Sequence, residues 1–270
     1  DVERIEKNGL TFLKTGTVEQ PILQKSGDDV RIDWGYFYFA GSEDQKTVLN
    51  FGDYWVPKDE FQSNGMISSE QSPQLSGNLI EEMPVLAYSQ DLGNVTTEDK
   101  TGFILLGYDD IYSIQYFGED LKGYWTMDGA VDIFQAFEQA KEEYASVMER
   151  CDVFNREMMA DAERAGGKKY AELCALVYRQ AIAAHKLVKD KEGTLLFLSK
   201  ENNSNGSIGT VDITYPSSPL FLIYNPELVK GLMNHIFYYS ESGKWTKPFA
   251  AHDVGTYPLA NGQTYGEDMP

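Results

Sequence analysis

The hydrophobic period of the chain changes at residues 125–129 (WTMDG), and this change constrains the fold more strongly than composition does. Before it, from residue 1 to about 124, short β-branched or aromatic runs are bounded by Gly, Asp and Ser, which is typical of strands. After it, apolar residues recur at three- and four-residue steps, as on one face of a helix. We therefore predict an α+β chain, with an antiparallel β-sandwich at residues 1–127 and a helical domain at residues 128–270.

Several segments of the first half carry the strand pattern. The expected strands lie at residues 30–40, 47–56, 85–88, 101–108 and 111–117. The segment at residues 58–79 is rich in Ser, Gln, Asn and Gly, and we expect it to be a long surface excursion.

The first two expected helices form an antiparallel hairpin. Asp128 can cap the first helix, which should end at Gly166–Gly167 because glycine tolerates the left-handed conformation of a C-cap. The second helix is expected at residues 168–189. Cys151 and Cys174 would then be offset along the hairpin by roughly 10 Å, at about 1.5 Å per residue. A disulfide needs Cα atoms within about 7 Å, so we expect two reduced, buried thiols.

A third helix is marked by Asn225 as its cap and Pro226 as its first residue. Two polar-aromatic loops flank it, at residues 200–219 and 241–270. Loops of this length inside a compact domain are usually functional or disordered. These are too rich in Tyr, Trp, Phe and Ile for disorder, and we predict that they form a pocket.

The charge balance limits the partners of the chain. Its 42 acidic and 23 basic residues give a net charge of -19. Nucleic acid and anionic membrane surfaces are therefore poor partners, since neutralising phosphates requires clustered Lys and Arg. No uninterrupted apolar run approaches the length of about 20 residues that spans a membrane. We expect a small-molecule substrate, no nucleic acid and no membrane insertion.

Asp212 in GTVDITYP and Asp253 in AHDVGTYP are the candidate catalytic pair. Two carboxylates in one pocket can act as general acid and general base when their environments differ, which permits hydrolysis without a metal. The alternative is that each carboxylate hydrogen-bonds backbone amides in its own loop, as Asp beside Gly commonly does.

Other residues of the loops and of the strand region are candidates for substrate binding. His252 could orient a carboxylate or a substrate, although a histidine that bonds a loop carbonyl is the commoner case. Asp33, in RIDWGY, needs a partner within an aromatic strand, and Arg31 lies two residues away on the same face. Glu267 is a third acidic candidate, with a solvated terminus as its alternative. The candidate binding residues are His252, Tyr215, Trp245, Lys247, Tyr257, Asp33, Trp34 and Glu267.

The sequence offers little support for a metal, a cofactor or a nucleophile. His185, His235 and His252 include none of the close helical pairs that are common at zinc sites, so no metal is expected. A Gly-x-Ser-x-Gly elbow is absent, and neither cysteine has a histidine in a recognisable context. The glycines of NGSIGT do not follow phosphate-loop spacing, which argues against a nucleotide cofactor.

The segments SKENNSNGSIGTVDITYPSSPLFL and KPFAAHDVGTYPLANGQTYGEDMP resemble the glutaminase A-like proteins of bacteria and fungi. RIDWGYFYFA resembles the end of the β-rich region of that family. The resemblance implies that the helical domain is the start of an α/α toroid of the six-hairpin glycosidase type. It also implies a secreted or periplasmic hydrolase that releases ammonia from glutamine, but it carries over no catalytic residues.

In the family the chain continues well beyond GEDMP, so the resemblance implies an incomplete toroid here. A C-terminal domain of the same protein is then an expected partner. We expect little or no glutaminase activity from this 270-residue piece alone, because catalysis requires excluded water and fixed geometry.

Three functions remain open. The first is a glutaminase-like amidohydrolase that uses Asp212 and Asp253. The second is a glycoside hydrolase of the six-hairpin type, because paired carboxylates with aromatic walls also suit sugars. The third is a non-catalytic carbohydrate- or peptide-binding module, which is favoured if the two carboxylates are far apart or salt-bridged.

Overall fold

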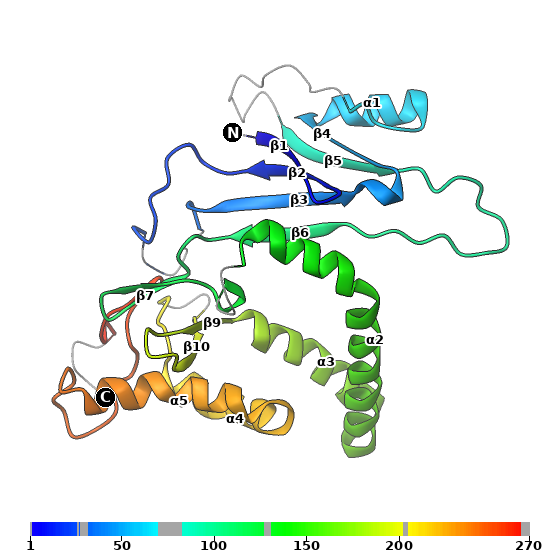
Figure 1. The fold of residues 1–270 in the computed structure, drawn as a ribbon. Coiled ribbons are helices and arrows are strands. Elements are labelled where there is room, and N and C mark those ends of the chain that lie inside the picture. Colours follow the sequence, from blue (N-terminus) through cyan, green and yellow to red (C-terminus); the bar gives the residue numbers. More distant parts are fainter. Residues whose placement is uncertain are drawn as a thin grey trace. The chain divides into compact units, whose positions relative to one another are not determined.

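A computed structural model of the chain describes residues 2–25, 27, 32–69, 83–126, 131–201 and 205–265 (Figure 1). The chain forms two compact units, each drawn from separated stretches of sequence. The sheet unit comprises residues 1–20, 35–109 and 132–142, and the helical unit comprises residues 21–34, 110–131 and 143–270. The units therefore interleave along the chain, whereas the expected domains at residues 1–127 and 128–270 follow one another.

Antiparallel strands build the sheet unit. A four-stranded sheet has the order β1-β2-β3-β6, and a separate two-stranded sheet pairs β4 with β5. The expected antiparallel sheets in the first half of the chain are confirmed, and their packing as a sandwich stays a prediction. The elements are β1 (Val2–Lys7), β2 (Leu10–Thr15), β3 (Tyr36–Ser42), η1 (Glu43–Gln45), β4 (Thr47–Asp53), α1 (Trp55–Asn64), β5 (Pro84–Gln90) and β6 (Leu105–Asp109).

Local sequence explains the tight turn between β1 and β2. Asn8 and Gly9 connect the strands with φ angles of 54° and 69°. Asn-Gly is the preferred pair for a two-residue hairpin turn that needs positive φ at both positions. The turn sets the register, in which Lys7 lies opposite Leu10.

Aromatic packing fixes the first turns of α2 (Ile133–Gly166) on the four-stranded sheet. The ring of Phe12 in β2 lies 5.1 Å from that of Phe134 and 5.2 Å from that of Phe137, measured between centroids. Tyr38 in β3 packs against Phe134 at 5.8 Å. A Cβ atom on Gly107 of β6 would lie 2.5 Å from the Phe137 ring, so glycine there allows the helix to approach the sheet.

The cap of α2 differs from the expected one. The Asp132 carboxylate accepts a hydrogen bond from the Gln135 backbone N–H at 2.8 Å, and the Gln135 side chain accepts one from the Asp132 N–H at 3.1 Å. This reciprocal pair is a capping box. Asp128, the expected cap, lies outside the described residues.

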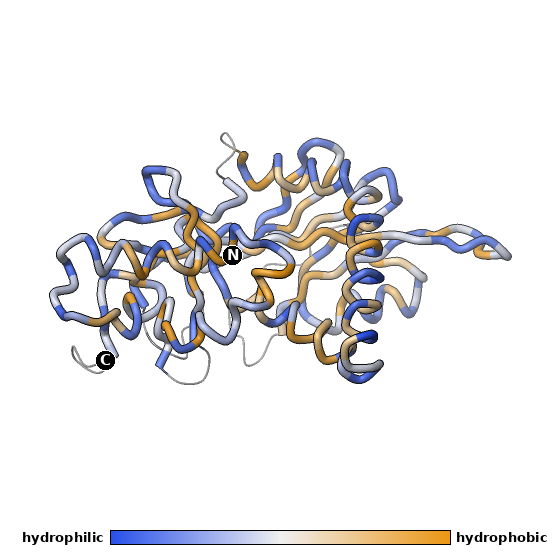
Figure 2. The backbone as a smooth tube through the Cα atoms, turned by 90° about the horizontal axis from the view of Figure 1, so that it is seen from below, coloured by the Kyte–Doolittle hydropathy of each residue, from blue (hydrophilic) through white to orange (hydrophobic). Residues whose placement is uncertain are grey.

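Two connections of the sheet unit differ from a plain hairpin loop. Residues 91–104, between β5 and β6, project from the sheets as a largely polar excursion (Figures 1 and 2). In the expected excursion at residues 58–79, residues 58–64 belong instead to α1, and residues 70–82 lie outside the described residues.

The helical unit contains two small sheets among its described residues. β11 pairs in parallel with β7, which pairs antiparallel with β8, and β9 forms a hairpin with β10. A buried cluster joins them, and it includes Trp34, Ile114, Val188, Leu196, Leu198, Ile208 and Ala260. The elements are β7 (Ile114–Tyr116), β8 (Glu119–Leu121), η2 (Tyr124–Thr126), α3 (Lys168–Ala183), β9 (His185–Lys189), β10 (Leu195–Ser199), α4 (Val211–Tyr224), α5 (Pro226–Glu241) and β11 (Leu259–Ala260).

The expected third helix is confirmed as α5, which begins at Pro226 directly after Asn225. It packs closely on β10 because Gly231 has no side chain, and a Cβ atom there would lie 2.9 Å from the Cβ of Phe197. The Asn234 side chain also donates a hydrogen bond to the Leu195 carbonyl at 2.8 Å.

The expected second helix is wrong beyond Ala183. It begins at Lys168 as expected, but residues 185–189 form β9. The sequence HKLVKDKEGTLLFLS contains a hairpin in which Leu187 lies opposite Phe197 and Val188 lies opposite Leu196. This non-local pairing overrides a local pattern that also suits a helix.

The first expected loop is wrong from residue 211 onwards, where α4 begins. Pro216 and Pro219 lack the N–H groups that a helix interior uses, so the segment has the composition of a loop. Its serines compensate in part, because the hydroxyl of Ser217 donates to the Ile213 carbonyl at 2.9 Å and that of Ser218 to the Thr214 carbonyl at 2.6 Å.

Both cysteines are free thiols, which confirms the absence of a disulfide between them. Their expected burial is wrong, since Cys151 is exposed and Cys174 is partly exposed. Among the described residues, none of the helices combines the length and apolar character that crossing a membrane requires.

Acid should destabilise the helical unit through His235. This side chain is fully buried on α5, close to Gly209, and burial lowers its pKa from 6.5 to about 4. Between these two values the unfolded chain binds a proton that the folded chain excludes, so stability is present above pH 6.5 and is lost as the pH falls towards 4. We expect a loss of about 3 kcal/mol from this residue.

Urea unfolding at a series of pH values checks this prediction, with His235→Gln as the control. The variant should be less stable at pH 7 but should lose less stability between pH 6.5 and 4. Parallel stability profiles for the two proteins would contradict the prediction.

Candidate functional site

Backbone hydrogen bonds join the segment after β10 to the C-terminal loop. Ile208 donates to the carbonyl of Gly255 at 2.8 Å, and Val254 donates back to the carbonyl of Ile208 at 3.0 Å. At the start of α4, Val211 donates to the carbonyl of His252 at 3.1 Å. The two loops therefore converge, as the sequence predicted, and the first turn of α4 lies beside His252.

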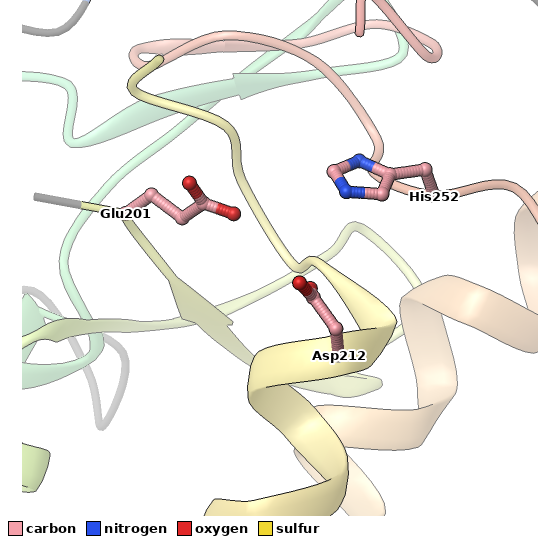
Figure 3. A group of neighbouring side chains, drawn as sticks. All are labelled: Glu201, Asp212 and His252. Carbon is pink, nitrogen blue, oxygen red and sulfur yellow. The ribbon is translucent and has the colours of Figure 1, made fainter. Parts of the chain in front are cut away.

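Three side chains meet where the loops converge. Glu201 follows β10, Asp212 lies in the first turn of α4, and His252 belongs to the C-terminal loop. One oxygen of each carboxylate and one ring nitrogen of His252 all lie within 4.8 Å of one another. Figure 3 shows the three side chains extending from three separate segments towards a common space. Asp212 is exposed, and the other two residues are partly buried.

Asp253 follows His252 in the chain and is 1% exposed. One of its oxygens accepts hydrogen bonds from the backbone N–H groups of Gly255 at 2.9 Å and Thr264 at 3.1 Å. The other accepts one from Tyr265 at 3.3 Å and lies 3.0 Å from Nδ1 of His252. Its carboxylate thus bonds loop amides, which is the alternative that the sequence left open, and it also orients the imidazole ring.

Glycine is required at position 255 for this arrangement. Its φ is 140°, and a Cβ atom there would collide with the carbonyl oxygen of Leu259. The same backbone donates to Asp253 and accepts from Ile208, so one residue connects the buried carboxylate with the pairing of the two loops.

A cavity of about 250 Å³ opens in the same unit. The Lys200 ammonium lies 5.9 Å from the ring centroid of Tyr257, and Lys200 directly precedes Glu201 in the chain. Lys186 is paired with the buried Asp110 at 2.8 Å. Burial lowers the pKa of His185 below its usual value. The lining residues are Ile32, Ala183, Ala184, His185, Lys186, Lys200 and Tyr257.

Comparison with known proteins shows the family of the chain. Residues 2–161 match the family model described as a domain of unknown function (DUF5127), and residues 167–270 match the Glutaminase A six helical-hairpin domain. Glutaminase A of Aspergillus oryzae is 30% identical over 275 residues, an alignment that covers 98% of this chain and 38% of that protein. The chain belongs to the glutaminase A-like family.

A second relative, a probable glutaminase of Arthroderma benhamiae, is 23% identical over 250 residues, which cover 88% of this chain and 28% of that protein. The chain thus spans well under half the length of either relative. No solved structure matches it significantly. In this glutaminase A-like chain, Glu201, Asp212, His252 and Asp253 all lie within the segment that matches the six helical-hairpin domain.

The other predicted site residues of the C-terminal region are dispersed. Tyr257 lines the cavity, whereas Tyr215 is 85% exposed on α4. Trp245 is buried against Tyr239 and Phe249, and Lys247 is exposed. The last predicted binding residue, Glu267, lies outside the described residues.

The two candidates from the strand region have structural contacts. The Trp34 indole is fully buried and donates to the carbonyls of Asp110 at 2.8 Å and Tyr112 at 3.1 Å. Asp33 forms an ion pair with Lys25 at 2.6 Å. Arg31, the expected partner of Asp33, lies outside the described residues.

Sequence reasoning missed Glu201 and Lys200. Both directly follow the apolar run LLFLS, which forms β10. Charged residues at the end of a buried strand lie at the edge of the core, where loops often carry functional groups. That position was the signal that could have identified them.

Asp212 and Asp253 should differ sharply in their effect on stability. Asp253→Ala leaves three buried or partly buried N–H groups unsatisfied, and we expect it to lower the free energy of unfolding by about 3 kcal/mol or more. Asp212→Ala removes an exposed charge from the first turn of a helix and should cost about 1 kcal/mol or less. Urea denaturation measures both, and similar losses for the two variants would contradict this division.

Proposed function

We propose that the chain carries part of the catalytic centre of a glutaminase-like amidohydrolase, which converts L-glutamine and water into L-glutamate and ammonia. The observation that carries this proposal is the convergence of Glu201, Asp212 and His252 within the segment that matches the Glutaminase A six helical-hairpin domain. The name of the Aspergillus relative, Glutaminase A, supports the choice of substrate.

Hydrolysis of the glutamine side chain requires groups that move a proton. Water attacks the amide carbonyl carbon, the carbon–nitrogen bond breaks, and the leaving nitrogen departs as ammonia. A positioned base takes a proton from the water, and an acid delivers one to the nitrogen. In the proposed centre the carboxylates of Glu201 and Asp212 and the imidazole of His252 supply these groups. Asp253 is a positioning residue, because it acts through the ring of His252.

Lys200 and Tyr257 line a cavity that could hold the α-carboxylate end of glutamine. Free glutamine carries an α-carboxylate, and the Lys200 ammonium beside the Tyr257 ring offers a positive charge in a cavity of about 250 Å³.

The activity of the whole protein, its secreted or periplasmic location and the completion of its toroid belong to the same proposal. The chain covers 38% of the Aspergillus relative, so further helices would complete the toroid. Exposed apolar side chains on α3 and α4 give such helices a surface to cover. These are Leu173, Leu176, Leu222 and Ile223, whose exposed fractions lie between 53% and 72%.

Ammonia release from L-glutamine tests the proposal, in this chain and in any longer protein that contains it. Asp212→Asn and His252→Gln should each lower the rate by about 100-fold or more, since each removes a proton-carrying group. Glu227→Gln is the matched control, because Glu227 also lies in the first turn of a helix, and it should leave the rate unchanged.

Other outcomes would identify the alternative functions. Full activity in the Asp212→Asn variant would contradict the proposed catalytic role of Asp212. Release of reducing sugar from glycosides without ammonia would favour a glycoside hydrolase, and saturable sugar or peptide binding without turnover would favour a binding module.

A further inference from the structure

We propose that Glu201, Asp212 and His252 bind a divalent transition-metal cation such as Zn²⁺ or Mn²⁺. Their candidate ligand atoms lie within 4.8 Å of one another and come from the end of β10, the start of α4 and the C-terminal loop (Figure 3). The sequence predicted no metal, because its histidines include none of the close helical pairs that are common at zinc sites. This site has one histidine, and the chain segments that supply the three ligands meet only in the fold.

The donor set selects the class of cation. Two carboxylate oxygens and one imidazole nitrogen suit Zn²⁺, Mn²⁺ and similar ions. Mg²⁺ and Ca²⁺ prefer oxygen ligands alone, so the imidazole makes them poorer occupants. We therefore expect transition-metal cations to bind more tightly than Mg²⁺ or Ca²⁺.

The second observation is the support beneath His252. Its Nδ1 atom lies 3.0 Å from the buried carboxylate of Asp253, which fixes the ring and leaves Nε2 as the nitrogen for a ligand. A carboxylate that orients a histidine in this way is the usual outer shell of a metal-binding histidine. The backbone around the ring is also held, since the His252 N–H donates to the Gln263 side chain at 2.7 Å and its carbonyl accepts from Val211.

The ligand atoms must move closer together to hold one ion. Three ligands at about 2.0–2.2 Å from one ion in tetrahedral geometry lie about 3.3–3.6 Å from one another. The observed atoms lie within 4.8 Å of one another, a limit that is larger by about 1 Å. Asp212 is exposed and Glu201 is only partly buried, so rotation of their side chains can close this gap while His252 stays in place.

Charge and polarity around the group favour a cation. Two carboxylates this close repel each other, and in the described part of the chain Asp212 has no salt bridge to offset that repulsion. The hydroxyls of Ser199 and Thr210, each two residues before a proposed ligand, are buried and have no hydrogen-bond partner among the described residues. Such groups ordinarily bond ordered water or a ligand.

Metal binding stands independently of the proposed function. In a hydrolase, a cation held by these three residues would polarise a carbonyl and activate water, and it would replace the direct proton transfer by Glu201, Asp212 and His252 proposed above. The test therefore measures binding itself and needs no turnover.

Titration of the purified, metal-free protein with Zn²⁺ by calorimetry, and with Mn²⁺ by electron paramagnetic resonance, tests the site in about 0.15 M salt. We expect one ion per chain and a raised melting temperature. Asp212→Ala, Glu201→Gln and His252→Gln should each weaken binding by at least about 10-fold, and Asp253→Asn by about 10-fold to 100-fold. Glu227→Gln, which removes one carboxylate from the first turn of α5, should bind like the parent protein.

Far-UV circular dichroism of each variant separates loss of a ligand from loss of fold, and Asp212→Ala remains informative because its side chain is exposed. Several weak sites that disappear in salt, or equal affinity in the parent, Asp212→Ala and Glu227→Gln proteins, would overturn the proposal. Glutamine hydrolysis that survives chelation, together with failure to bind Zn²⁺ or Mn²⁺, would overturn this inference and leave the proposed function intact. Metal binding without glutamine hydrolysis would support this inference and contradict the proposed function.

Discussion

The backbone pairing between the segment after β10 and the C-terminal loop is the constraint on which the candidate site depends. Ile208 exchanges hydrogen bonds with Val254 and Gly255, and Val211 bonds the carbonyl of His252. Without these bonds, Asp212 and His252 would belong to unrelated parts of the surface. The pairing depends in turn on a glycine at position 255, where any side chain would collide with the Leu259 carbonyl. A residue with no side chain thereby helps to determine where two candidate site residues lie.

Sequence patterns predicted the helical elements best where local chemistry determines them. Asn225–Pro226 marks the start of α5, and Gly166–Gly167 marks the turn between α2 and α3, because capping and φ preferences act within a few residues. The wrong predictions occur where residues distant in the sequence determine the secondary structure. β9 is a strand because it pairs with β10, and α4 is helical although its two prolines suggest a loop. The cap of α2 was missed for a different reason, since Asp128 and Asp132 have the same capping chemistry and only the partnership with Gln135 distinguishes Asp132.

The site could be predicted only in part for the same reason. Asp212 and His252 stood out because they occur in segments rich in aromatic residues, glycine and proline, and the fold brings them together. Glu201 belongs to the group only because β10 ends beside the first turn of α4, which no local pattern encodes. Sequence also gave equal weight to Asp212 and Asp253, although one is exposed and the other is 1% exposed. Burial separates residues of identical chemistry, and burial is a property of the fold rather than of the motif.

This separation explains how one loop can serve both stability and chemistry. The two oxygens of Asp253 accept hydrogen bonds from three backbone amides, and one of them also contacts the ring of His252. These bonds stabilise the loop. Glu201 and Asp212 remain close enough to repel each other, an arrangement that contributes little to folding. A fold tolerates such repulsion when a cation or a substrate offsets it, and rigid support from beneath reduces the cost of ordering the site when that ligand binds. The buried acid therefore holds the ring of His252, beside which the two more accessible acids lie.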